Sequence, residues 1–92
     1  MKKPIQKVIY RYWQKEVIAI LPGVSVNYGN VCIYARVGQH SEADSFITRA
    51  GRLATPEEYA PLHRELTGIY DDHELIIKKR VQHSDLRKGW TK

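Results

Sequence analysis

The sequence of 92 residues lacks several features that would place it in a known class of protein. A single cysteine, Cys32, excludes an internal disulfide framework, and its position among strand-forming residues is typical of a buried thiol. No apolar run approaches the roughly 18 residues of a membrane span, and the basic first residues are not followed by the apolar stretch of a signal peptide. We therefore expect a cytoplasmic protein that makes no contact with a membrane.

Carboxylates are absent from the beginning of the chain and scarce at its end. Residues 1–15 contain five lysines and arginines and no acid, and residues 78–92 contain six against Asp85 alone. Residues 16–77 contain nine carboxylates and four arginines. The net charge of +5 is therefore concentrated at the two ends of the chain, and the centre is acidic.

Alternating side chains and many β-branched or aromatic residues predict strands over residues 5–13, 17–21, 31–37 and 73–81. A helix should begin after Thr55, because Thr55, Pro56 and Glu58 have the pattern of a capping box with proline at the first position. Pro61 should make its first turn irregular, and Gly68 should end it. Residues 38–54 show no regular pattern, which is long for a connection in a compact domain.

The order strand, strand, strand, helix, strand predicts an α+β fold. We expect a mainly antiparallel four-stranded sheet with one helix packed on one face, and the last strand beside the first. Residues 1–82 should form this single domain, and residues 83–92 should form a flexible basic tail.

Three segments, VIAILPG, YARVGQHSEAD and RLATPEEYAPLHREL, follow one another in the sequence. In this order they resemble a family of small uncharacterised bacterial and bacteriophage proteins, which share an IALFP-like strand, a VGQH-containing turn and an ATPEEY-like helix. The resemblance covers about residues 8 to 80, and the sequence departs from the pattern at Ala35 and Ser41. It implies an origin on a phage or mobile element, where small proteins often bind and block host components, and it implies no reaction.

The densest group of hydrogen-bonding side chains follows the third predicted strand. His40 could act as an acid or base if Glu42 or Asp44 orients it, since imidazole titrates near neutrality. Alternatively, these side chains tie down the long loop by bonding its backbone. We predict no catalysis, and keep an enzyme that uses His40 as one alternative. The candidate binding residues are Arg36, Gly38, Gln39, His40, Glu42 and Asp44.

The four histidines do not have the spacing of metal ligands, and Cys32 has no second cysteine with which to share an ion. We therefore predict neither a metal nor a cofactor.

Basic residues in the first and last predicted strands indicate a second candidate site. If these strands pair, their cations would form one stripe that could hold phosphates, with tryptophans on which a base could stack. A charged outer face also keeps a sheet soluble. The pattern alone therefore does not distinguish a phosphate-binding stripe from an ordinary charged surface. The residues of the predicted stripe are Lys7, Arg11, Trp13, Lys78, Lys79, Arg80, Arg87, Lys88 and Trp90.

A single helix can cover only one face of a four-stranded sheet. The other face would expose either Tyr10, Tyr12 and Tyr34 or an aliphatic set, and such patches favour protein contacts. We therefore expect a small non-enzymatic binding protein that occupies a host macromolecule and could inhibit a host defence protein. A host protein is the first expected partner, nucleic acid is the alternative, and a homodimer is also expected.

Overall fold

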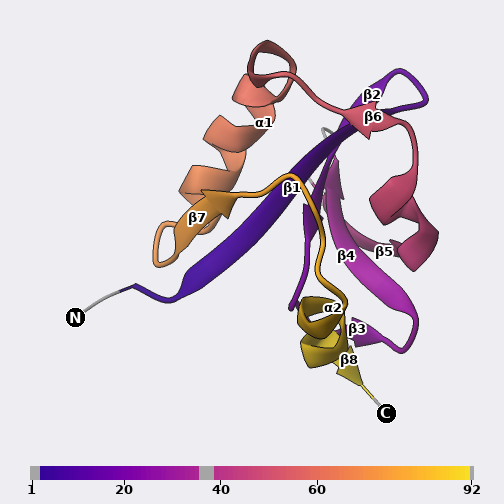
Figure 1. Ribbon diagram of the computed structural model, residues 1–92. Helices are drawn as coiled ribbons and strands as arrows, with labels where there is room; N and C mark the ends of the chain where they lie inside the picture. Colours follow the sequence, from indigo (N-terminus) through magenta and orange to yellow (C-terminus); the bar gives the residue numbers. More distant parts are fainter. Residues whose placement is uncertain (1–2, 36–38, 92) are drawn as a thin grey trace.

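The computed structural model describes residues 3–35 and 39–91 and shows an α+β protein in which helices cover both faces of one mixed sheet (Figure 1). The sheet contains β1 (Ile5–Trp13), β2 (Glu16–Leu21), β4 (Asn30–Ala35), β5 (Gln39–Asp44), β6 (Arg52–Leu53) and β7 (Glu74–Ile77). The helical segments are η1 (Ser45–Arg49), α1 (Pro56–Ile69) and α2 (His83–Gly89). A separate small sheet pairs β3 (Val26–Asn27) with β8 (Trp90–Thr91).

The strand order is β5-β4-β2-β1, and β6 and β7 both pair with the far side of β1. The predicted α+β class and the position of the last strand beside the first are confirmed. The expected antiparallel four-stranded layout differs from the structure, because β5 and β6 are additional strands and β7 runs parallel to β1. Sequence periodicity missed β5 because this strand lies at the sheet edge and is mostly polar.

The last strand is also shorter than predicted. β7 ends at Ile77, and the Lys78 amide donates the final ladder hydrogen bond to the Val8 carbonyl at 2.8 Å. Residues 78–82 then leave the sheet and lead to α2. The prediction that Lys78 and Arg80 extend from one strand is therefore wrong, because both lie in this connection, Lys78 directly after the last strand residue.

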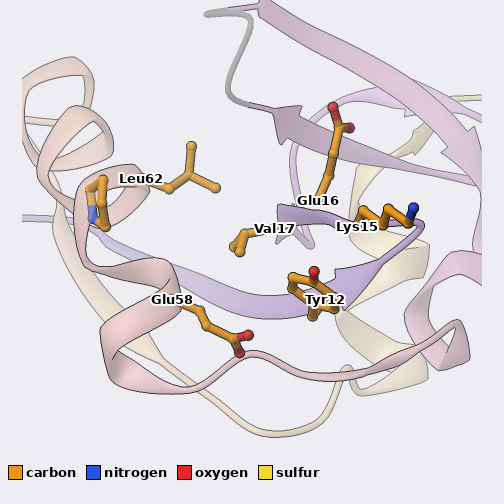
Figure 2. A pocket seen from close by; sticks show the side chains of 7 residues that line it. Tyr12, Lys15, Glu16, Val17, Glu58 and Leu62 are labelled. Atoms are coloured by element: carbon orange, nitrogen blue, oxygen red, sulfur yellow. The ribbon is translucent and has the colours of Figure 1, made fainter.

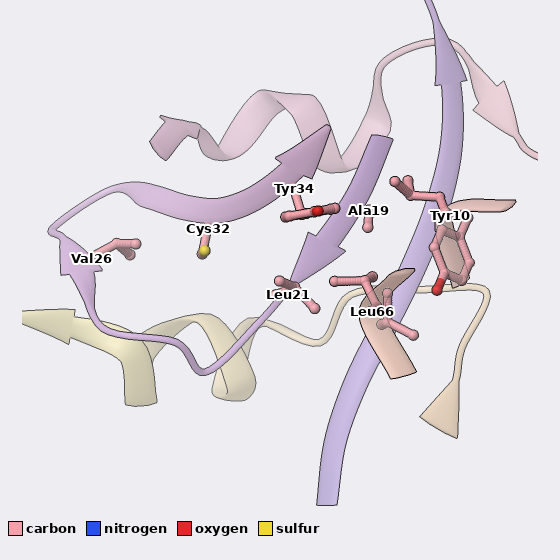
Figure 3. Close-up of a cluster of buried hydrophobic side chains, with 9 residues drawn as sticks. Tyr10, Ala19, Leu21, Val26, Cys32, Tyr34 and Leu66 are labelled. Carbon is pink, nitrogen blue, oxygen red and sulfur yellow. The ribbon is translucent and has the colours of Figure 1, made fainter. Parts of the chain in front are cut away.

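Each central strand is apolar on both sides, and this explains why both faces of the sheet are covered. Figure 3 shows the cluster on the α1 face, where Tyr10 and Tyr34 are each 2% exposed and pack with Leu66 of α1. On the opposite face, strand residues such as Ile9 pack against Ile47 of η1 and Leu86 of α2. The expected exposed face of aromatic or aliphatic side chains is therefore absent from the described part of the chain.

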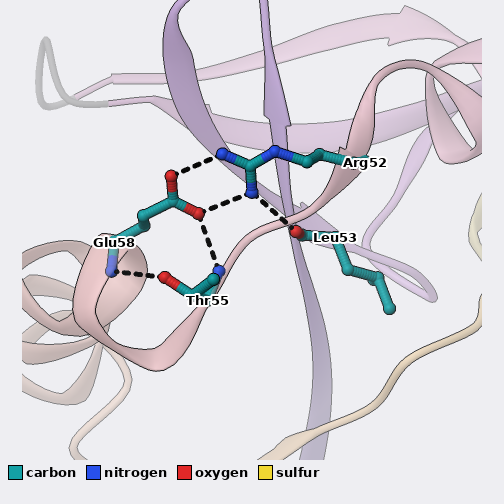
Figure 4. A network of polar contacts seen from close by, with 4 residues as sticks. All are labelled: Arg52, Leu53, Thr55 and Glu58. Carbon is teal, nitrogen blue, oxygen red and sulfur yellow. Dashed lines mark hydrogen bonds and ion pairs between the residues drawn. The ribbon is translucent and has the colours of Figure 1, made fainter.

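The start of α1 is as the sequence predicts. The Thr55 hydroxyl accepts from the Glu58 amide, and the Glu58 carboxylate accepts from the Thr55 amide, which completes the capping box (Figure 4). Arg52 adds two hydrogen bonds of 2.7 Å to the same carboxylate. The helix remains α-helical through Pro61 and ends at Ile69, so the irregular first turn and the stop at Gly68 are wrong.

The C-terminal segment has regular structure, which differs from the flexible tail that we expected. Leu86 of α2 is 8% exposed, and the indole N–H of Trp90 donates to the Asn30 carbonyl at 2.6 Å. Gly89 permits this packing, because a Cβ there would lie 2.3 Å from the Val24 carbonyl oxygen. No helix in the described ranges is long and apolar enough to cross a membrane.

The turn between β1 and β2 contains two residues and has an unusual composition. Gln14 and Lys15 have φ angles of 51° and 65°, and Trp13 pairs directly with Glu16. Two successive residues at positive φ define a type I′ hairpin turn, which normally contains asparagine or glycine. The structure thus identifies a turn that the sequence leaves undefined, and this turn is strained.

Candidate functional site

The polar residues around His40 do not form one site. β5 runs antiparallel to β4, so Gln39 lies opposite Ala35 while Asp44 lies opposite Asn30 at the far end. At about 3.4 Å per residue, the backbone positions of His40 and Asp44 are separated by about 14 Å. Arg36 and Gly38, which belong to the predicted site, lie outside the described residues.

Each described side chain of this group has its own structural contact. The His40 ring shares a hydrogen bond of 2.9 Å with the Tyr70 hydroxyl, and burial raises the pKa of that hydroxyl. Glu42 accepts from the Asn27 amide and the Asn30 side chain, and these bonds hold the pKa of its carboxyl below the usual value. Asp44 accepts from the Phe46 amide and caps η1. Neither carboxylate orients His40, so the arrangement does not resemble an acid–base pair.

A hollow of about 370 Å³ lies between the first turns of α1 and the β1–β2 hairpin (Figure 2). Its walls are Tyr12, Val17 and Leu62 with Pro61, and none of its lining residues is a histidine, cysteine, serine or threonine. The Glu58 carboxylate at its rim is held by Arg52 and Thr55, as described above. Among the described residues, no cluster of three histidine, cysteine or acidic side chains could hold a metal ion.

Cations from three separate segments meet on the sheet face opposite α1. One hollow of about 470 Å³ lies between η1 and residues 79–83, and a second of about 230 Å³ lies between β1 and residues 78–82. Lys79 and Arg80 line both, so the two hollows are adjacent. We name them together the basic groove. Its charged lining residues are Lys7, Arg11, Arg49, Lys78, Lys79, Arg80 and Asp85, with His83 at one side.

Two of these cations already serve the fold. Lys7 forms an ion pair of 3.0 Å with Asp85, whose side chain is 13% exposed. Arg11 donates from Nε to the Ala50 carbonyl at 2.6 Å and from Nη2 to the Gly51 carbonyl at 3.1 Å. These contacts fasten α2 and the segment after η1 to β1, and they fix the walls of the groove.

The other four cations of the groove are available for a ligand. Within the described part of the chain, the side chains of Arg49, Lys78, Lys79 and Arg80 have no hydrogen bond or ion pair, and all four residues are exposed. Asp85 is the one carboxylate of the lining, and Lys7 neutralises it. The groove is therefore a concave surface with an uncompensated positive charge.

Five carboxylates lie away from the groove. α1 carries Glu57, Glu58 and Glu65 above the opposite face of the sheet, and Asp71 and Asp72 follow its last turn. Cations lie among them, because Arg52 pairs with Glu58 and Arg64 is on the same helix. The unpaired cations of the groove therefore favour approach of a polyanion to the groove.

Some residues of the predicted stripe line the groove, and others lie elsewhere. Lys7, Arg11 and residues 78–80 line the groove, whereas Trp13 is half-buried against the core and its ring lies 6.0 Å from that of Phe46. Trp90 is packed between Tyr28 and His83 and donates to Asn30, so its ring is not a free stacking surface. Arg87 and Lys88 are exposed on α2 but do not line the groove.

Sequence reasoning missed Arg49 and His83 as lining residues of the groove. Arg49 lies in η1, within a stretch whose structure the sequence does not reveal, and His83 begins a helix that we expected to be a loose tail. These residues lie near each other because η1 and residues 79–83 line the same hollow in the folded chain.

No protein-family model matches the chain, and no curated protein or solved structure matches it either. The function is therefore argued from the geometry of the groove.

Proposed function

We propose that the protein is a non-enzymatic binding protein that holds the phosphate backbone of a nucleic acid in its basic groove. The observation that carries the proposal is the concave meeting of six lysines and arginines from β1, η1 and residues 78–80, with one carboxylate that is already paired. Phosphate contacts from lysine and arginine supply most of the sequence-independent affinity of nucleic-acid-binding proteins.

The shape of the groove supports a nucleic acid over the host protein that the sequence first suggested. An uncovered apolar or aromatic sheet face would favour a host protein, but α1, η1 and α2 cover both faces. The exposed surface on the η1 side is instead the basic groove, which is charged and concave. The protein would still act by occupying a macromolecule, and that macromolecule would be a nucleic acid.

The number of unpaired cations sets the expected salt dependence. If Arg49, Lys78, Lys79 and Arg80 each contact one phosphate, the plot of log affinity against log salt should have a slope of roughly −3 for a single strand and −3.6 for a duplex. The measured slopes for a single strand and for a duplex can therefore each be compared with the value expected for four phosphate contacts.

The test uses fluorescence anisotropy with labelled single-stranded and duplex oligonucleotides over a series of salt concentrations. The variant Lys79→Glu/Arg80→Glu changes the two residues that line both hollows. The control Lys15→Glu/Arg64→Glu makes the same change of net charge at two exposed positions outside the groove.

We expect the groove variant to lose affinity and to reduce the magnitude of the salt slope by about 2, while the control variant retains most of the affinity. Equal losses in both variants would show that net charge alone causes binding. Absence of binding by the unmodified protein at low salt would refute the proposal.

A further inference from the structure

Within the described residues β7 is paired on one side only, as β5 is at the opposite edge of the sheet. β7 bonds to β1 through the Glu74 and Lys78 amides, which donate to the Pro4 and Val8 carbonyls at 2.8 Å. Because successive residues of a strand alternate in direction, the N–H and C=O groups of Leu75 and Ile77 point away from β1. No strand within residues 3–35 or 39–91 pairs with this outer edge. Figure 1 shows β7 beside β1, near the end of α1.

The sequence of β7 is complementary to itself in one register. If two copies pair antiparallel with Ile76 opposite Ile76, Leu75 lies opposite Ile77 and Glu74 lies opposite Lys78. The outward-pointing residues Leu75 and Ile77 are then the hydrogen-bonded pair, as the antiparallel ladder requires. The side chains of Glu74 and Lys78 lie on the same face of the sheet, so each would meet the opposite charge across the axis.

Exposed apolar side chains mark the same edge. Ile77 is 41% exposed on β7, and Ile5, which pairs with Glu74, is 58% exposed on β1. The opposite edge of the sheet is different, because the described side chains of β5 are mainly polar: His40, Ser41, Glu42 and Asp44. Polar and charged side chains protect an edge strand from pairing. The only charged residue of β7 is Glu74 at its start, and Lys78 directly follows its end, where self-pairing would neutralise both.

We propose that β7 is the contact surface for a second copy of this chain, joined by antiparallel pairing across a two-fold axis at Ile76. The two sheets then form one continuous sheet, and the isologous contact is closed, as in most soluble dimers. Both basic grooves lie on the same face of this sheet, on either side of the axis. The inference stands on the strand edge and does not depend on the proposed nucleic-acid function.

A strand of four residues makes a small interface. It lies at the low end of protein interfaces, below about 1,200 Å² of total buried area, so the dimer should be weak and should form at concentrations near 0.1–1 mM (an order-of-magnitude range). Sedimentation velocity over a concentration series from micromolar to millimolar, at low salt and without nucleic acid, measures this association.

The charge pairing allows a test that does not depend on a single variant. Glu74→Lys alone places two lysines opposite each other at both ends of the pairing, and Lys78→Glu alone places two glutamates there. Each variant should be monomeric at concentrations where the unmodified protein is a dimer. An equimolar mixture of the two should form a heterodimer, because each Lys then meets a Glu at both positions.

The backbone part of the pairing has its own matched variants. Ile77→Pro removes an N–H that points away from β1, so it keeps the bonds to β1 and abolishes one of the outward donors. Ile77→Val keeps the N–H and a similar side chain. We expect Ile77→Pro to be monomeric and Ile77→Val to associate as the unmodified protein does, with circular dichroism used to confirm that both are folded.

The inference would be overturned if the unmodified protein stayed monomeric up to about 1 mM. It would also be overturned if the mixture of Glu74→Lys and Lys78→Glu gave no heterodimer while both variants were folded. Should Ile77→Pro fail to fold, the mixed-charge experiment still decides the question.

Discussion

Replacing Lys15 with glycine should stabilise the protein, because Lys15 is held at a φ of 65° in the two-residue turn between β1 and β2. A left-handed conformation costs a residue with a Cβ roughly 1–2 kcal/mol, and glycine does not bear this cost. Glycine loses more conformational freedom on folding, which offsets about 0.5–1 kcal/mol of the gain. The net increase in the free energy of unfolding should therefore be about 0.5–1 kcal/mol.

Thermal unfolding followed by circular dichroism measures this effect. For a domain of this size, about 0.5–1 kcal/mol corresponds to a rise in Tm of roughly 2–8 °C. The matched control is Lys15→Ala, which removes the same charged side chain but keeps a Cβ at positive φ, so its Tm should not rise. An equal rise in both variants would show that the side chain, and not the backbone, causes the change. No rise in Lys15→Gly would refute the strained type I′ turn.

Three further predictions concern the loop after η1, the helix cap and the C-terminal segment. Gly51→Ala should lower the free energy of unfolding by about 2 kcal/mol or more in urea titrations, because a Cβ there would lie 2.1 Å from the Tyr12 carbonyl oxygen. The hydrogen bonds from Arg52 lower the pKa of Glu58 from 4.5 to about 2, so its contribution is present above pH 4.5 and is lost as the pH falls toward 2. Glu58→Gln should therefore flatten the loss of stability over that pH range, and an unchanged acid limb would contradict this role. Trp90→Phe removes the indole donor. It should lower the free energy of unfolding in urea by about 1 kcal/mol without changing the far-ultraviolet circular dichroism spectrum.

The sequence predicts the elements whose local signals are strong. β1 has the predicted bounds of 5–13, because its nine residues alternate and are rich in β-branched and aromatic side chains. The capping box at Thr55 and Glu58 is confirmed because both of its hydrogen bonds form between near neighbours in sequence. β5 was missed because pairing with β4, and not its own polar composition, makes it a strand.

The site was harder to predict than the fold for a physical reason. Lys7 and Arg11 lie in a well-predicted strand, but the groove exists only where η1 and residues 78–82 pack against that strand. No local pattern relates Arg49 to Lys79, since their proximity results from tertiary packing. The cluster around His40 shows the opposite case, because residues close in sequence are drawn apart along an extended strand.

The position of β1 has a consequence for the kinetics of folding. Its hairpin with β2 joins immediate neighbours in the sequence, whereas its parallel partner β7 begins at Glu74, about three quarters of the chain length after Ile5. Contacts between distant residues require the closure of a long loop before they yield any free energy, and they slow the search for the native state. We therefore expect the hairpin to form early, and the docking of β7 to limit the overall refolding rate.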